Sequence, residues 1–105
     1  MRIVPARWIG AVLVCGKCSK KVGGGFGDKG HTSLAKALRR YLGFKKGRKA
    51  AAGVVEVKCL GLCPKRMVVA IDTTRPGEWR LVAPGTPIET VAAELGLIPR
   101  PSTHA

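Results

Sequence analysis

The chain has 105 residues, of which 46% are hydrophobic and only 5% aromatic, which predicts one compact domain with a mainly aliphatic core. Lys and Arg number 19 against 6 Asp and Glu, so the formal net charge is +13 and predicts attraction to anionic partners or surfaces. The few acidic residues form no paired-carboxylate or Ser/His/Asp arrangement, which argues against a hydrolase.

The cell compartment decides how the four cysteines are interpreted. Two tight cysteine pairs suit disulfides in a secreted chain or metal ligands in a reducing compartment. The apolar run Ile9–Val14 is too short for a signal sequence, and no A-x-A cleavage site follows it. No run approaches the length that crosses a membrane. We therefore expect a cytoplasmic protein with reduced thiols and no membrane span.

The first part of the chain predicts a strand, a loop and a helix. Trp8–Val14 is a near-continuous apolar run that ends at Cys15, typical of a strand buried on both faces. Residues 16–30 are rich in glycine and lysine, which predicts a mobile loop without regular structure. Thr32 is the expected N-cap of the first helix and Gly43 its end. The apolar positions of this helix are Leu34, Leu38, Tyr41 and Leu42.

The later part predicts three strands. Residues 55–58 alternate between valine and charged side chains, which indicates a strand with one buried face that leads into Cys59. Two apolar segments, Met67–Ile71 and Trp79–Val82, flank a turn at 75–77. These two segments are expected to form a hairpin.

The last helix is the best-defined element of the sequence. It is expected to begin at the capping box Thr86-Pro87-Ile88-Glu89, with Pro87 at the first helical position, and to end at Gly96. The order β-α-β-β-β-α predicts an α/β fold with a central four-stranded mixed sheet and two main helices. The expected parts are an N-terminal extension (1–7), the domain (8–98) and a flexible C-terminal tail (99–105).

The cysteines form the strongest chemical pattern. Cys15 and Cys18 are separated by two residues, Cys59 and Cys63 by three, and each pair follows a predicted strand. If the two strands are parallel neighbours, both loops lie at one edge of the sheet and the four sulfurs converge. Thiolates at close range repel one another without a cation, so such sites normally hold zinc or an iron–sulfur cluster. The four cysteines are therefore candidate metal ligands.

The spacing alone suits zinc as well as iron–sulfur. Zinc usually staples a domain that lacks enough core, whereas this chain already has two amphipathic helices and several apolar strands. The context therefore favours an iron–sulfur cluster and leaves zinc as the alternative.

Three segments carry a resemblance to a known family: Val12-Leu13-Val14-Cys15, Lys58-Cys59-Leu60-Gly61-Leu62-Cys63-Pro64, and Trp79 with Pro84-Gly85-Thr86. From about Ile9 to Leu97 the chain resembles the thioredoxin-like [2Fe–2S] ferredoxins, which are related to the small iron–sulfur subunit of respiratory NADH dehydrogenases. The resemblance implies a thioredoxin-like fold and one [2Fe–2S] cluster near the surface. Cys15 and Cys18 would bind one iron, and Cys59 and Cys63 the other. Family members usually space the first pair more widely.

By this resemblance the protein is a one-electron carrier and not an enzyme. Six basic residues flank the cysteines and are the expected partner-docking residues: Lys17, Lys20, Lys21, Lys58, Lys65 and Arg66. Their charge is expected to recruit an acidic redox partner in a salt-sensitive association. Ferredoxins are commonly acidic, so the charge of this chain departs from the family. A homodimer stays open.

A thiol–disulfide oxidoreductase is one rival function. Cys15-Gly16-Lys17-Cys18 after a strand is also typical of a redox-active dithiol, in which a helix N-terminus lowers the thiol pKa. The loop predicted over residues 16–30 argues against it, because the first helix then starts near Thr32. This function also leaves Cys59 and Cys63 unexplained.

Nucleic-acid binding is the other rival, suggested by basic residues on the first helix and after it. They are Lys36, Arg39, Arg40, Lys45, Lys46, Arg48 and Lys49. Specific support is missing, since the sequence has no RNP-type aromatic motif and no zinc-finger Cys/His pattern.

Overall fold

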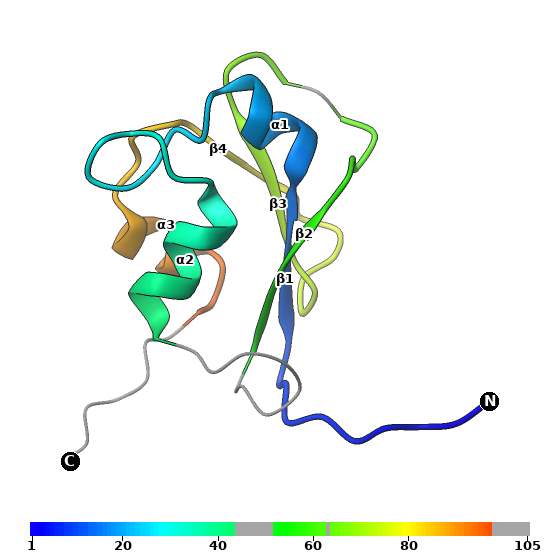
Figure 1. Ribbon diagram of the computed structural model, residues 1–105. Coiled ribbons are helices and arrows are strands. Elements are labelled where there is room, and N and C mark those ends of the chain that lie inside the picture. Colours follow the sequence, from blue (N-terminus) through cyan, green and yellow to red (C-terminus); the bar gives the residue numbers. More distant parts are fainter. Residues whose placement is uncertain (44–51, 63, 98–105) are drawn as a thin grey trace, which may run out of the picture.

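The computed structural model describes residues 1–43, 52–62 and 64–97. The elements in these ranges are β1 (Ala11–Cys15), α1 (Gly16–Lys21), α2 (Leu34–Leu42), β2 (Gly53–Val57), β3 (Val68–Asp72), β4 (Arg80–Val82) and α3 (Ile88–Glu94). The chain is an α/β protein with a four-stranded mixed sheet, which confirms the prediction (Figure 1). Helix α1 is additional to the two helices that the sequence predicts.

The sheet has the strand order β2-β1-β3-β4. Strands β1 and β2 are parallel, with Ala11 opposite Gly53 and Cys15 opposite Val57. Strand β3 is antiparallel to both β1 and β4, so the predicted hairpin of the last two strands is confirmed. Parallel neighbours need a crossover connection, and α1 and α2 both lie in the connection from β1 to β2. The two parallel strands therefore end at the same edge of the sheet.

The core lies between the sheet and the helices α2 and α3, which pack against each other (Figure 1). Val12 and Val14 of β1 and all of β3 are buried. The helical side of the core is made of Leu34, Leu38, Leu42, Val91, Ala92 and Leu95. The aliphatic core expected from the composition is therefore present, because each of these elements turns an apolar stripe inward.

The glycine content predicts a loop without regular structure over residues 16–30. The structure shows that this prediction is wrong. These residues begin with α1, where the Ser19 hydroxyl donates to the Cys15 carbonyl at 2.9 Å. The remaining glycine-rich segment is held by Phe26, which is 2% exposed and forms a β-bridge with Thr32. Gly24 has a φ of 89° and lies so close to the His31 carbonyl that a Cβ would not fit. Gly24 therefore permits a close backbone approach at this point.

Strand β1 begins at Ala11 and not at Trp8, because the chain before it stays outside the sheet. Ile9 is 87% exposed and Trp8 is 38% exposed. The indole of Trp8 lies against Gly53, where a Cβ would overlap the ring. Trp8, the first residue of the apolar run, therefore covers the first residue of β2 and does not lengthen β1.

The ends of α2 follow the prediction in part. Ser33, and not Thr32, is the N-cap, and its hydroxyl accepts a hydrogen bond from the Lys36 amide at 3.4 Å. Gly43 ends the helix in the left-handed conformation, with a φ of 62°, as expected. Tyr41 was expected to be packed but is 43% exposed, because it lines an open groove beside the start of α3.

Helix α3 lacks the predicted capping box. The sequence predicts Pro87 as the first helical residue, but Pro87 is the N-cap and the helix begins at Ile88. No side chain caps the helix. The Thr86 hydroxyl donates to the Ala83 carbonyl at 2.6 Å instead, so it serves the preceding turn. The helix end agrees with the sequence, since Gly96 follows it with a φ of 71°. The predicted tail 99–105 lies outside the described residues.

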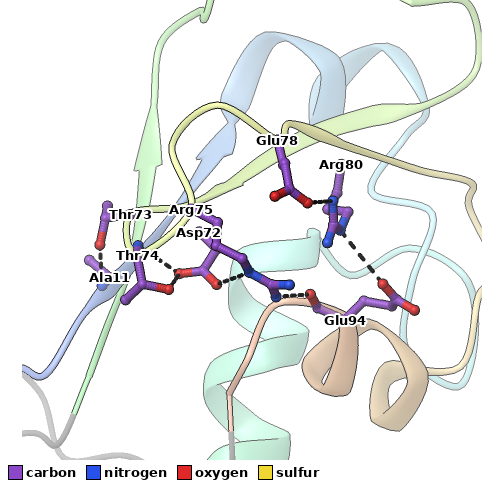
Figure 2. A network of polar contacts seen from close by, with 8 residues as sticks. All are labelled: Ala11, Asp72, Thr73, Thr74, Arg75, Glu78, Arg80 and Glu94. Carbon is purple, nitrogen blue, oxygen red and sulfur yellow. Dashed lines mark hydrogen bonds and ion pairs between the residues drawn. The ribbon is translucent and has the colours of Figure 1, made fainter.

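Asp72, at the end of β3, is the buried charged residue of the described chain. Its carboxylate accepts hydrogen bonds from the Thr74 amide at 2.9 Å and the Thr74 hydroxyl at 2.8 Å, and pairs with Arg75 at 3.5 Å (Figure 2). Burial alone would raise the pKa of Asp72, but these hydrogen bonds and the Arg75 charge lower it below its usual range. The ionised form is therefore the one that the fold stabilises.

The same turn connects three elements. The Thr73 hydroxyl accepts from the Ala11 amide at 2.9 Å, which joins the turn to β1. Arg75 donates to the Glu94 carbonyl at 3.1 Å, and Arg80 pairs with the Glu94 carboxylate at 3.6 Å, so both reach α3 (Figure 2). The network fixes the hairpin β3–β4 relative to α3.

We predict that Asp72→Asn lowers the free energy of unfolding by about 1–3 kcal/mol at neutral pH, because hydrogen bonds to a charged group contribute on that order. The folded-state pKa of Asp72 lies below its unfolded-state value of about 3.9. Its stabilisation is therefore present above that value and is lost as the pH falls through the folded-state pKa.

Urea unfolding of the wild type and the variant at about pH 7 and about pH 3 measures this loss. The difference between the two proteins should shrink in acid, and a difference independent of pH would contradict the assignment. Glu78→Gln in the same turn is the control, because the side chain of Glu78 is 60% exposed and its surface ion pair contributes little.

Candidate metal centre

The two cysteine-bearing loops lie side by side at one edge of the sheet. Strand β1 ends at Cys15, its partner β2 ends at Val57, and Cys59 follows two residues later. The Lys17 amide donates to the Lys58 carbonyl at 3.0 Å, so α1 is hydrogen-bonded to the second loop. In Figure 1, α1 and the segment after β2 lie at the same end of the molecule. The convergence that the sequence suggested for the loops is therefore present.

Gly16 allows this close approach. A Cβ at residue 16 would come within 2.9 Å of the Val57 carbonyl and 3.2 Å of the Glu56 side chain. The Val57 carbonyl is held in place, since Val57 is paired with β1 at this point. A larger residue at position 16 would push α1 away from β2.

Cys15 directly precedes α1 and Cys18 lies on its first turn, and both are buried, with 0% and 2% exposure. The Cys15 sulfur accepts a hydrogen bond from the Cys18 amide at 3.4 Å. Cys15 is therefore the N-cap of α1, and one helical turn brings the Cys18 side chain near it.

The surroundings of Cys15 favour a thiolate. Burial would raise the pKa of the Cys15 thiol, but hydrogen bonds from the Cys18 amide and thiol and from the Leu60 amide lower it below its usual range. These donors come from both cysteine loops. A sulfur with several amide donors suits a group that binds through thiolates.

The second loop lies over the first cysteine pair. The Leu62 carbonyl oxygen lies 3.8 Å from the Cys18 sulfur, and the Leu60 amide is one of the groups that lower the pKa of Cys15. Cys59 is exposed, and its sulfur accepts a hydrogen bond from the Gly61 amide at 3.3 Å. Gly61 has a φ of 87°, a left-handed conformation that turns its amide toward the sulfur.

The structure describes three of the four predicted ligands. Cys63 lies outside the described residues. Within residues 1–43, 52–62 and 64–97, no group of three or more Cys, His, Asp or Glu side chains is arranged to hold a metal ion. Cys59 is thus in the loop that covers Cys15 and Cys18, and its sulfur does not join theirs in such a group. The ligand set stays a prediction.

The six predicted docking residues are all exposed: Lys17, Lys20 and Lys21 on α1, Lys58 after β2, and Lys65 and Arg66 before β3. Arg66 has a φ of 56°, which is rare for a residue other than glycine. It forms part of the turn that returns the second loop to the sheet.

The basic residues on α2 have different roles. Arg39 donates through Nε and Nη2 to the Val54 carbonyl, at 3.1 and 2.7 Å, and so attaches α2 to β2. Lys36 and Arg40 are exposed. The other four residues of the predicted nucleic-acid surface, Lys45, Lys46, Arg48 and Lys49, lie outside the described residues.

Sequence reasoning missed the groups that surround the Cys15 sulfur and its backbone. The amides of Lys17 and Leu60 carry no side-chain signal, because any residue other than proline supplies an amide. Ser19 lies four residues after Cys15, and in a helix this spacing places its hydroxyl at the Cys15 carbonyl. The spacing predicts this hydrogen bond only once α1 is recognised as a helix.

Comparison of the chain with protein-family models, with curated proteins and with solved structures finds no match in any of the three. In the part of the chain that the structure describes, no helix is long and apolar enough to cross a membrane.

We predict that Cys15 in the metal-free, reduced protein titrates below the range of an ordinary thiol, about 8.5. NMR of the protein labelled with ¹³C at cysteine Cβ follows this titration residue by residue. Cys18→Ala removes the thiol donor and should raise the pKa of Cys15. Ser19→Ala is the control, because its hydroxyl contacts the Cys15 carbonyl and not the sulfur. If Cys18→Ala leaves the pKa of Cys15 unchanged, the Cys18 thiol does not donate a hydrogen bond to the Cys15 sulfur.

Proposed function

We propose that the chain binds one [2Fe–2S] cluster through Cys15, Cys18, Cys59 and Cys63 and works as a one-electron carrier. The observation that carries the proposal is the parallel pairing of β1 and β2, which brings both cysteine loops to one sheet edge. This pairing brings two segments that are distant in sequence close enough for four thiolates to bind one centre.

The hydrogen-bond donors at the sulfurs fit such a cluster. The Cys18 amide donates to the Cys15 sulfur, and the Gly61 amide donates to the Cys59 sulfur. Amide donors stabilise negative charge on cysteine sulfur, and hydrogen bonds to sulfur are one determinant of cluster potential. The donors therefore suit ligands that must accept an added electron.

A bound cluster would supply reversible one-electron oxidation and reduction. The residues of the chain would do the rest. The buried pair Cys15 and Cys18 would keep one side of the centre out of water. Exposed Cys59 would leave the other side within reach of a partner, and the surrounding lysines would stabilise the added charge.

We further propose that the fold is thioredoxin-like. The strand order β2-β1-β3-β4, with a parallel first pair followed by an antiparallel hairpin and a helix, supports this. The position of Cys15 at the end of the first strand supports it as well. The cytoplasm, where thiols stay reduced, is the compartment that suits such a site.

One observation favours a second function, thiol–disulfide exchange at Cys15 and Cys18. Helix α1 starts directly after Cys15, and the Cys18 amide donates to the Cys15 sulfur, contrary to the predicted loop that argued against this chemistry. Both thiols are buried, however, so a substrate disulfide could reach neither of them without displacing the loop 59–62. The structure therefore supports the cluster better.

We predict that protein purified without oxygen is brown and contains two irons and two sulfides per chain. Reduction should give the electron paramagnetic resonance signal of one [2Fe–2S] centre. A colourless protein with one tightly bound zinc per chain, after expression with ample iron, would refute the proposal in favour of the zinc alternative.

We predict that Cys15→Ala, Cys59→Ala and Cys63→Ala each abolish stable cluster binding, because each leaves an iron without a full set of ligands. Iron content and the visible spectrum measure the loss. Cys18→Ala tests the first pair separately, since an unchanged spectrum in this variant would exclude Cys18 as a ligand. Ser19→Ala, a buried neighbour outside the ligand set, should keep the cluster. Insulin-disulfide reduction that survives Cys59→Ala and requires Cys15 would support thiol exchange instead.

A further inference from the structure

An exposed apolar side chain stands among the basic residues at the cysteine loops. Leu62 is 43% exposed, and its carbonyl oxygen lies 3.8 Å from the Cys18 sulfur. This short distance places Leu62 beside α1, whose three lysines are exposed. Lys58 and Lys65, which precede and follow Leu62 in the chain, are exposed as well. The Lys17–Lys58 backbone bond holds α1 and the loop together. We call Leu62 with Lys17, Lys58, Lys65 and Arg66 the Leu62 patch.

The charge of the patch is of one sign. Residues 11–27 and 57–71, which contain α1 and the second loop, include no Asp or Glu. The nearest carboxylate along the chain is Glu56, whose side chain lies beside Gly16. An anionic partner therefore meets a positive surface at the patch, and the field falls off with salt.

We propose that the Leu62 patch docks an acidic redox protein, whose carboxylates contact the basic residues and whose apolar centre covers Leu62. This inference rests on the proposed function. A stable contact between proteins commonly has an apolar centre within a polar rim, and the patch has both. The phosphate groups of a nucleic acid would contact the basic residues but would not bury the exposed leucine, so a protein fits the patch better.

The position of the patch suits the transfer of one electron. Cys59 is exposed three residues before Leu62, so a docked protein would lie against the open side of the proposed cluster. The reduced cluster would lose one electron and be oxidised, and a flavin or haem of the partner would gain it. No bond forms or breaks, and no proton needs to move. The chain stays strongly positive in both states, because the cluster with its thiolates subtracts only two or three from +13.

Helix α2 offers a matched control. Lys36 and Arg40 are exposed on α2, and their reversal changes the total charge as much as reversal of two patch residues does. The comparison is Lys17→Glu/Lys65→Glu against Lys36→Glu/Arg40→Glu. Arg39 is left intact, because it attaches α2 to β2. Any effect of net charge alone should be equal in the two double variants.

The first experiment measures oxidation of the reduced holoprotein by two small probes in a stopped-flow instrument. Ferricyanide is an anionic one-electron oxidant and hexaamminecobalt(III) a cationic one. We expect the patch variant to lower the ferricyanide rate about fivefold or more at low ionic strength and to raise the cobalt rate. The α2 variant should change either rate less than about twofold, and added salt should bring the rates of the three proteins together.

The second experiment tests the apolar centre with two acidic polymers, polyglutamate and a glutamate–tyrosine copolymer of similar charge. The holoprotein should bind the copolymer more tightly, because tyrosine can cover Leu62. Leu62→Ala should remove this preference while leaving the visible spectrum and the ferricyanide rate unchanged. The patch double variant should weaken binding of both polymers, and the α2 variant should weaken neither strongly.

Three results would overturn the proposal. Equal effects of the two double variants would show that only net charge acts, and a copolymer preference that Leu62→Ala preserves would remove the apolar centre. Loss of binding to a DNA duplex in the patch variant, with polymer binding unchanged, would assign the patch to nucleic acid. A protein without a cluster would refute the proposed function by its spectrum, and polymer binding would still decide whether the patch docks an acidic protein.

Discussion

The parallel pairing of β1 with β2 is the constraint on which the rest of the structure depends. It places Cys15 opposite Val57, and it places the start of α1 against the end of β2. Gly16 is needed there, since a Cβ would meet the Val57 carbonyl. The Lys17–Lys58 backbone bond follows from the same contact. A crossover connection is required to make this pair parallel, and α1 and α2 lie within it.

This arrangement gives the candidate centre two unlike sides. Cys15 and Cys18 are enclosed beneath the second loop, where amides from both loops lower the pKa of the Cys15 thiol despite its burial. Cys59 faces solvent with one amide donor. One cysteine pair is thus shielded from solvent, and the cysteine of the second loop is accessible. Exposed basic residues lie on the same loops, so the surface beside Cys59 carries positive charge.

Much of the fold followed from hydrophobic periodicity and turn residues. The strands after residue 52, the hairpin and the helix ends at Gly43 and Gly96 agree with the pattern, because each depends on neighbours in the chain. Local signals failed at three places, where a competing hydrogen bond or a contact outside the pattern decided the outcome. Residues 16–21 form a helix in spite of their glycine-rich continuation. Thr86, which a capping box would use, instead donates to the Ala83 carbonyl. Nothing in the sequence indicates that the Arg39 side chain donates to the Val54 carbonyl.

The sequence by itself determined the α/β class, the aliphatic core, the two cysteine pairs after strands and the excess of positive charge, because composition and periodicity are properties of the chain alone. Only the tertiary structure decided that α1 begins at Cys15, that Leu60 and Leu62 contact the first pair, and that Leu62 remains exposed among lysines. These contacts join segments more than forty residues apart. They exist because parallel strands bring two loops to one edge, which no local pattern encodes.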